Sequence, residues 1–306
     1  LNITYPLAHY EVAKQALLAG KHVYTEKMTT ETVEQANELI ALAKEKNLFI
    51  GGAPDTFLGG SMQLARRITD SGILGTPVMA EAFLSRSYHH ERYYTGDEKR
   101  FAFCRHGGIM FDMGAYYLTD LVFLLGAMEK VNGFTQIRDP HRVYQNPKGP
   151  LFGTPMEVES PNNTTANIRF QNGALATFTM TSESSTFSNR FVLHCTDGII
   201  NLGDPNNYES TVKIYNKKGE ESILKTPFAY RDGNFRGIGL IDAVYALRNG
   251  RKPRCNAELN RHVLEAAVGM CESSKNGKTY SFTTTCERPE PLEVGYTCYP
   301  ELVFRV

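Results

Sequence analysis

The chain has 306 residues, of which 42% are hydrophobic, and its formal net charge is zero. That length supports one large or two ordinary domains, each with a real core. A neutral balance argues against a nucleic-acid or membrane-surface protein, which would carry a basic excess. No apolar run approaches the roughly 20 residues of a membrane span, and the first residues lack the basic and apolar regions of a signal peptide.

The cysteines predict neither a metal site nor a disulfide framework. They are scattered along the chain, and no two of them form a Cys-x-x-Cys pair. Such spacing suits reduced thiols, so we expect a cytoplasmic protein without a bound metal.

The first fifty residues alternate strand and helix. Strands are predicted over 1–5, 22–25 and 48–50. A helix with Gly20 as its stop lies between the first two strands, and a second helix, capped by Thr29 or Thr30, lies between the last two. Strand and helix in this order predict right-handed crossovers and a parallel sheet, typical of an α/β dinucleotide-binding unit.

From Pro54 onward the pattern is α+β. Helices are predicted over 60–73, 107–125, 238–249 and 259–274, and 88–106 is a long polar and aromatic loop. Alternating residues over 166–170 and 174–180, joined by Asn172-Gly173, predict a hairpin. We therefore expect a partial Rossmann-type sheet over 1–53, followed over 54–306 by a large, mostly antiparallel sheet covered by helices on one face.

The usual phosphate-binding loop is not in the sequence. No G-x-G-x-x-G follows a predicted strand, and Gly237-Ile-Gly239 is better explained as a helix start. Residues 1–53 are thus predicted to be the C-terminal half of a dinucleotide-binding domain. Whether the missing half is a natural feature or a truncation of the sequence stays open.

Two stretches hold the candidate chemistry. The strand at 22–25 delivers Glu26 and Lys27 to its carboxyl end, where ligands of open parallel sheets bind. On the apolar helix 107–125, Asp112 and Tyr116 share one face. The alternatives are a solvated lysine and an aspartate satisfied by a neighbouring element. Together Lys27, Asp112 and Tyr116 would make a general acid/base set for oxidising a secondary alcohol.

The residues resemble the Gfo/Idh/MocA-type oxidoreductases, which are NAD(P)-dependent enzymes acting on sugars and polyols. The likeness rests on four stretches: Thr4-Tyr-Pro6 with His9 leading to Glu26-Lys27, Gly52-Ala-Pro54, Gly107-Gly-Ile-Met-Phe-Asp112-Met-Gly114, and Arg236-Gly237 through Gly250-Arg251 to His262. The resemblance implies that Lys27 contacts substrate and cofactor, with Glu26 beside the nicotinamide ribose. It also implies that Thr4, Pro6 and His9 pass along the nicotinamide half of NAD or NADP.

This sequence departs from the family pattern at two site positions. Met28 stands where the family has proline, and Tyr116 stands where it often has histidine. A phenol with a reference pKa near ~10 is a poor base unless a cation lowers that value. The proton is therefore assigned to either Lys27 or Tyr116.

We expect an oxidoreductase that moves a hydride between a nicotinamide cofactor and a sugar, polyol or related secondary alcohol. Without the phosphate loop we expect the chain to bind NAD(P)H poorly and to be inactive, because the pyrophosphate has no helix N-terminus. Secondary candidates for substrate contact are Tyr88, His89, Tyr93 and Arg105. Two rivals are an NAD-dependent glycoside hydrolase and a non-catalytic sugar or cofactor sensor. A homo-oligomer, dimer or tetramer, is expected through the open sheet face.

Overall fold

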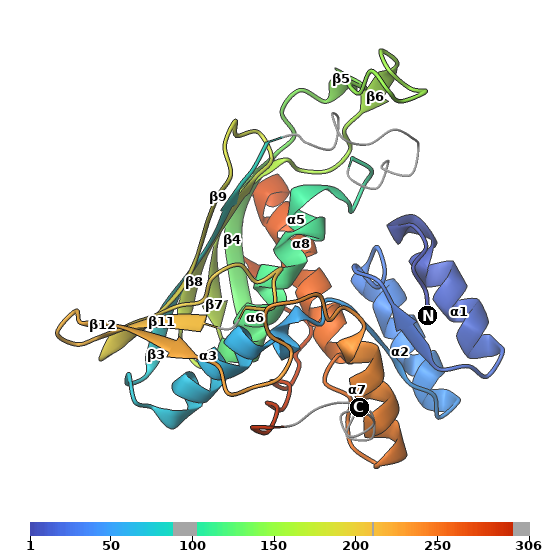
Figure 1. Cartoon of the computed structure of the whole chain (residues 1–306). Helices are drawn as coiled ribbons and strands as arrows, with labels where there is room; N and C mark the ends of the chain where they lie inside the picture. Colours follow the sequence, from blue (N-terminus) through green and yellow to red (C-terminus); the bar gives the residue numbers. More distant parts are fainter. Residues whose placement is uncertain (88–102, 210, 296–306) are drawn as a thin grey trace.

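The computed structural model describes residues 1–87, 103–209 and 211–295. Figure 1 shows a small N-terminal unit in blue beside a large curved sheet, with helices packed on one face of that sheet. Parallel strands that precede a large, mainly antiparallel sheet confirm the predicted fold class.

The N-terminal unit has two parallel strands and two helices. Its elements are η1 (Pro6–Ala8), α1 (His9–Leu18), β1 (Val23–Thr25), α2 (Val33–Glu45) and β2 (Ile50–Gly52). Apolar side chains of α1 and α2 pack over the two strands, and Ala257 of a later helix closes this small core.

Three boundaries in this unit differ from the prediction. The first predicted strand is reduced to a single bridge between Asn2 and Thr25. The second helix is capped by Thr32 and not by Thr29 or Thr30, since Gln35 completes a capping box with Thr32. The third strand begins two residues later, at Ile50. Its Gly51 has to be glycine, because a Cβ there would collide with the backbone carbonyl of Cys255.

The segment after β2 connects the two sheets. It contains η2 (Thr56–Leu58), α3 (Gly60–Ser71), β3 (Pro77–Ser85), α5 (Gly108–Asp112) and α6 (Gly114–Leu125). The predicted helix 107–125 is therefore broken at Met113. By length and composition Gly108–Leu125 is apolar enough to cross a membrane, but 89% of it is buried inside the protein, where it forms the centre of the core.

The large sheet has nine strands in the order β12-β11-β10-β9-β3-β8-β7-β4-β13. The strands not yet defined are β4 (Met128–Gln136), β7 (Asn163–Phe170), β8 (Leu175–Thr181), β9 (Ser188–Cys195), β10 (Gly198–Asn201), β11 (Thr211–Asn216), β12 (Glu221–Lys225) and β13 (Tyr280–Ser281). Among the described strand pairs of this large sheet, only the β3–β8 pair is parallel. A separate hairpin, β5 (His141–Val143) and β6 (Pro155–Glu157), extends from one end.

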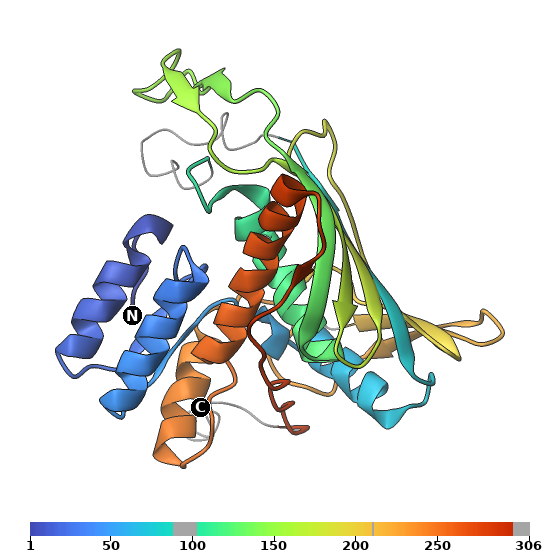
Figure 2. The ribbon, with the colours of Figure 1, turned by 180° about the vertical axis from the view of Figure 1, so that it is seen from behind.

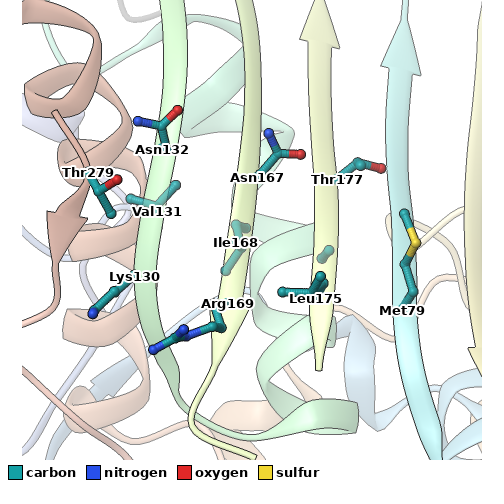
Figure 3. A pocket seen from close by; sticks show the side chains of 11 residues that line it. Met79, Lys130, Val131, Asn132, Asn167, Ile168, Arg169, Leu175, Thr177 and Thr279 are labelled. Carbon is teal, nitrogen blue, oxygen red and sulfur yellow. The ribbon is translucent and has the colours of Figure 1, made fainter. Parts of the chain in front are cut away.

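The helices leave one face of this sheet uncovered. The helix α6 and the late helix α8 (Ala257–Asn276) cover the inner face, and α7 (Ile238–Arg248) lies below α8 in the view of Figure 1. Figure 2 shows α8 running between the N-terminal unit and the sheet. On the outer face, side chains of Asn132, Asn167 and Thr177 stand in a row across β4, β7 and β8 (Figure 3). The arrangement agrees with the predicted one-sided cover.

The chain passes from the N-terminal unit to the rest at Ala53 and Pro54. The backbone N–H of Gly52 donates to the Cys255 carbonyl at 3.2 Å, and the Asn260 side chain donates to the Ala53 carbonyl at 3.1 Å. These bonds hold the end of β2 against the start of α8. The domain boundary between residues 53 and 54 stays a prediction.

Candidate functional site

The two chemistry-bearing stretches of the sequence meet in space. Lys27 follows the buried strand β1, and Asp112 is the last residue of α5. The Lys27 Nζ lies 2.7 Å from the Asp112 Oδ1, with 13% and 20% of the two side chains exposed. A partly buried ion pair of this kind holds the lysine in one direction. The strand end and the helix face therefore meet in the structure, and their use as one catalytic site stays a prediction.

Tyr116 completes this cluster one helical turn beyond the break at Met113. Its ring is buried, and the Lys27 Nζ lies 5.2 Å from the ring centroid. A cation at this distance is attracted to the ring face. The structure thus brings Lys27, Asp112 and Tyr116 together.

The electrostatics give Lys27 and Tyr116 different protonation states. Burial lowers the pKa of Lys27, but its neighbours, above all the Asp112 carboxylate, outweigh burial and leave that pKa above its usual value. Burial raises the pKa of the Tyr116 phenol, and Lys27 and Arg236 lower it by less. At neutral pH Lys27 is therefore protonated and Tyr116 is neutral. The lysine is suited to give a proton, and the phenol to form hydrogen bonds.

A cavity of about 430 Å³ opens beside Lys27. It is lined by Ile3, Thr4, Tyr5, Pro6, His9, Glu26 and Lys27, and this set contains every residue predicted to bind the cofactor. The volume is in the range of ligand sites, which run from roughly 300 to 1,000 Å³. The mixture of apolar rings, a hydroxyl, a carboxylate and an ammonium fits the nicotinamide and ribose end of a dinucleotide.

His9 holds together two of the segments that line this cavity. The ring is buried, with Nδ1 at 2.6 Å from the carbonyl oxygen of Met28 and Nε2 at 2.9 Å from that of Thr4. His9 therefore ties the start of the chain to the segment that follows Lys27, and so fixes two walls of the cavity.

Arg236 joins the cluster, although sequence reasoning did not select it as a site residue. Its Nη1 donates to the Tyr116 hydroxyl at 3.3 Å, and its guanidinium carbon lies 5.5 Å from the ring centroid. The sequence singled out Arg236-Gly237 only as part of a family-like stretch. A contact between residues 120 positions apart leaves no trace in periodicity or spacing.

The predicted substrate loop is described only in part. Tyr88, His89 and Tyr93 lie outside the described residues. The Arg105 side chain is 71% exposed, and its Nη2 lies 3.4 Å from the Glu31 Oε2. Arg105 therefore contacts Glu31, which lies four residues after Lys27 in the sequence. Among the described residues no group of His, Cys, Asp and Glu could hold a metal ion.

Comparison with protein families identifies this architecture. Residues 3–51 match an oxidoreductase family domain with an NAD-binding Rossmann fold, and residues 62–201 match the Gfo/Idh/MocA C-terminal domain. The chain belongs to the Gfo/Idh/MocA family. Both the family and the NAD-binding type of its first domain are as predicted.

Curated relatives of this Gfo/Idh/MocA protein match it over part of their length. An uncharacterized oxidoreductase of Schizosaccharomyces pombe is 33% identical over 126 residues, which are 41% of this chain and 33% of the relative. The D-xylose dehydrogenase of Paenarthrobacter nicotinovorans is 30% identical over 132 residues, 42% of this chain and 34% of the enzyme. The matches thus span about a third of these relatives.

Solved structures share the fold over nearly all of the chain. Levoglucosan dehydrogenase in complex with NADH and L-sorbose has a TM-score of 0.78 at 19% identity, with 93% of this chain and 80% of that chain covered. Aldose-aldose oxidoreductase from Caulobacter crescentus, complexed with glycerol, has a TM-score of 0.73 at 18% identity, with 92% and 79% covered. At these identities the likeness establishes the fold.

Proposed function

We propose that this chain carries the catalytic site of an oxidoreductase that transfers a hydride between a nicotinamide cofactor and a secondary alcohol of a sugar or polyol. The observation that supports this proposal most is that Lys27 belongs both to the cavity and to the cluster around Asp112. This side chain lines the cavity beside β1 and also pairs with Asp112 at 2.7 Å. A group at that border can touch the hydroxyl of a substrate that lies next to a bound nicotinamide.

The cavity residues Thr4, Pro6, His9 and Glu26 would hold the nicotinamide and its ribose. When bound, the cofactor supplies the hydride chemistry, which protein side chains cannot perform. The sequence holds no G-x-G-x-x-G loop for the pyrophosphate, so weak cofactor binding and low activity of this chain belong to the proposal.

In this mechanism Lys27 is the residue that exchanges a proton with the reacting oxygen of the substrate. In the direction of carbonyl reduction, the protonated Nζ gives its proton to the substrate oxygen as that oxygen gains negative charge. In the direction of alcohol oxidation, Lys27 first loses a proton to solvent and then accepts the one from the substrate hydroxyl. Asp112 aligns the Nζ through the ion pair, and the neutral Tyr116 hydroxyl donates a hydrogen bond to the same substrate oxygen.

The proposal extends to the substrate class and to self-association. Relatives and structural neighbours named for D-xylose, levoglucosan and aldoses support a carbohydrate substrate. The open face of the nine-stranded sheet carries exposed apolar side chains such as Phe134 and Leu175, which supports association of two copies through that face.

Substitution of Lys27 tests the mechanism. The chain would be incubated with NAD⁺ or NADP⁺ over a range of concentrations and with D-xylose, L-sorbose or levoglucosan, while reduced cofactor is followed by absorbance. Lys27→Ala should lower kcat/KM by roughly 10²- to 10⁴-fold, as loss of a general acid/base does. Lys21→Ala is the control, because Lys21 is exposed two residues before the same strand.

Full activity of the Lys27→Ala variant would overturn the proposal. Release of free sugar from a glycoside without net cofactor reduction would instead favour the glycoside hydrolase. A biological effect that survives both Lys27→Ala and Asp112→Ala would favour the non-catalytic sensor.

A further inference from the structure

Arg236 brings a second cation to the Tyr116 ring. Both the Lys27 Nζ and the Arg236 guanidinium carbon lie within 5.5 Å of the same ring centroid. Lys27 is neutralised by Asp112 at 2.7 Å. Among the described ion pairs, none joins Arg236 to a carboxylate; its hydrogen bonds go to the Tyr116 hydroxyl and to Asn206. Arg236 therefore makes no direct ion pair among the described residues, although its charge opposes the rise that burial causes in the pKa of the nearby Asp55 carboxyl.

The backbone around Arg236 is held firmly. Asp55, just after Pro54, accepts hydrogen bonds from the N–H groups of Gly237 and Gly239 at 2.9 and 3.0 Å, and from the Tyr208 hydroxyl at 2.9 Å. Gly237 adopts a left-handed conformation with φ of 100° and begins α7. The oxygens of the buried Asp55 thus accept from the backbone and from Tyr208, and Asp55 makes no direct ion pair with Arg236, whose charge acts on it only at longer range.

The Arg236 guanidinium has more N–H groups than it has acceptors among the described residues. Its Nη1 donates to Tyr116 and its Nη2 donates to the carbonyl and the Oδ1 of Asn206, at 3.1 and 2.6 Å. A guanidinium carries five N–H groups, so two of them have no acceptor among the described residues. The side chain is exposed at the cluster's edge, where a ligand can reach those N–H groups.

We propose that Arg236 is a subsite for a carboxylate on the substrate, and that the substrate is an acidic sugar such as a uronic or aldonic acid. The inference rests on the proposed function, because it places the reacting hydroxyl at Lys27 and the carboxylate at Arg236. A guanidinium stays charged at every physiological pH and forms strong, charge-assisted bonds to carboxylates. A single sugar molecule that spans Tyr116 touches both cations.

A role limited to holding Tyr116 explains less of the geometry. The Arg236–Tyr116 hydrogen bond is 3.3 Å long and needs only a neutral donor. In that role two N–H groups of the guanidinium remain without an acceptor among the described residues. The carboxylate of an acidic sugar would accept hydrogen bonds from them.

The test measures binding and turnover with D-glucuronate and with the neutral D-glucose. Wild-type protein should bind D-glucuronate more tightly than D-glucose by calorimetric titration, and added salt should weaken only the former. Arg236→Gln should lower the affinity for D-glucuronate by about 10- to 100-fold, the range for a lost charge-assisted hydrogen bond, and leave D-glucose unchanged. Arg236→Lys should recover part of the loss.

Arg248→Gln is the matched control. It removes an exposed positive charge from the far end of the same helix α7, and it should leave the affinity for both sugars unchanged. Equal binding of the two sugars by the wild-type protein, or an equal loss for both in Arg236→Gln, would overturn the subsite. Selective uronate binding without any cofactor reduction would leave the subsite standing and contradict the proposed function.

Discussion

At the scale of single residues, Asp112 decides when Lys27 holds its proton. Burial alone would lower the pKa of Lys27, and the charge of Asp112 contributes most to raising it above the usual value. Asp112→Asn keeps the shape of the side chain and removes that charge, so the pKa of Lys27 should fall. Alcohol oxidation needs the neutral form of Lys27. The rate of oxidation therefore rises with pH until the pKa of Lys27 is passed.

The expected result is a shift of the pH profile of kcat/KM. In Asp112→Asn the rise for alcohol oxidation should move to lower pH, and the fall for carbonyl reduction should move in the same direction, with a lower maximum rate in both. Profiles measured in both directions, with Tyr116→Phe as a comparison, check this. A profile that moves in Tyr116→Phe but not in Asp112→Asn would assign the proton to the phenol.

The sequence could predict part of this site. Lys27 was found from its place at the end of a buried strand, and Asp112 and Tyr116 from their shared face on an apolar helix. These are local patterns, and each needs only a few neighbouring residues. Arg236 could not be found in this way, because it reaches Tyr116 through Asp55, which holds the start of α7 from 182 and 184 positions away.

At the scale of elements, α6 buries a carboxylate that accepts no hydrogen bond from any residue that the structure describes. Asp120 is 1% exposed, and neither of its oxygens has a hydrogen-bond partner among the described residues. Burial, together with the nearby Asp204, raises the pKa of Asp120 well above its usual value. Asp120 therefore keeps its proton to higher pH in the folded protein than in the unfolded chain, where it ionises above about pH 4.

Asp120→Asn should stabilise the protein more as pH rises. Folding of the wild-type chain takes up a proton at Asp120, so its contribution to stability falls as pH rises from about 4 through the pKa of the folded state. The variant does not titrate there, and its advantage should grow by at most about 1.4 kcal/mol per pH unit. Urea unfolding at pH 5 and pH 8 measures it, and the exposed Glu45→Gln is the control. An advantage that is independent of pH would contradict the neutral state.

The sequence predicts the type of each element better than its boundaries. The apolar periodicity of residues 107–125 gave the buried helix, but not its break at Met113. Gly114, the first residue after the break, packs closely against a distant strand: a Cβ on it would lie 2.9 Å from the Phe178 ring, so the close approach needs glycine there. The helix α5 ends at Asp112, whose carboxylate accepts a hydrogen bond from the Lys27 Nζ at 2.7 Å. Such consequences of tertiary contact are invisible in a local pattern.

At the scale of the whole molecule, the sheet has one covered face and one open face. The open face combines polar rows, such as Asn132, Asn167 and Thr177, with apolar side chains (Figure 3). Phe134 is 71% exposed and Leu175 is 50% exposed. Patches that mix apolar centres with polar neighbours are typical of protein interfaces. The open face of a nine-stranded sheet is large enough to supply the roughly 1,200 Å² or more that a stable dimer buries.

Two charges introduced into this face should separate the copies. In a twofold interface each substitution occurs twice, so Phe134→Glu with Leu175→Glu places four carboxylates in one contact. The wild-type chain should sediment as a dimer or larger, and the double variant as a monomer with an unchanged far-UV spectrum. Ile73→Glu is the control, because Ile73 is 72% exposed but follows α3, away from the sheet. A monomeric wild-type chain, or a double variant that still associates, would show that the copies do not meet through this face.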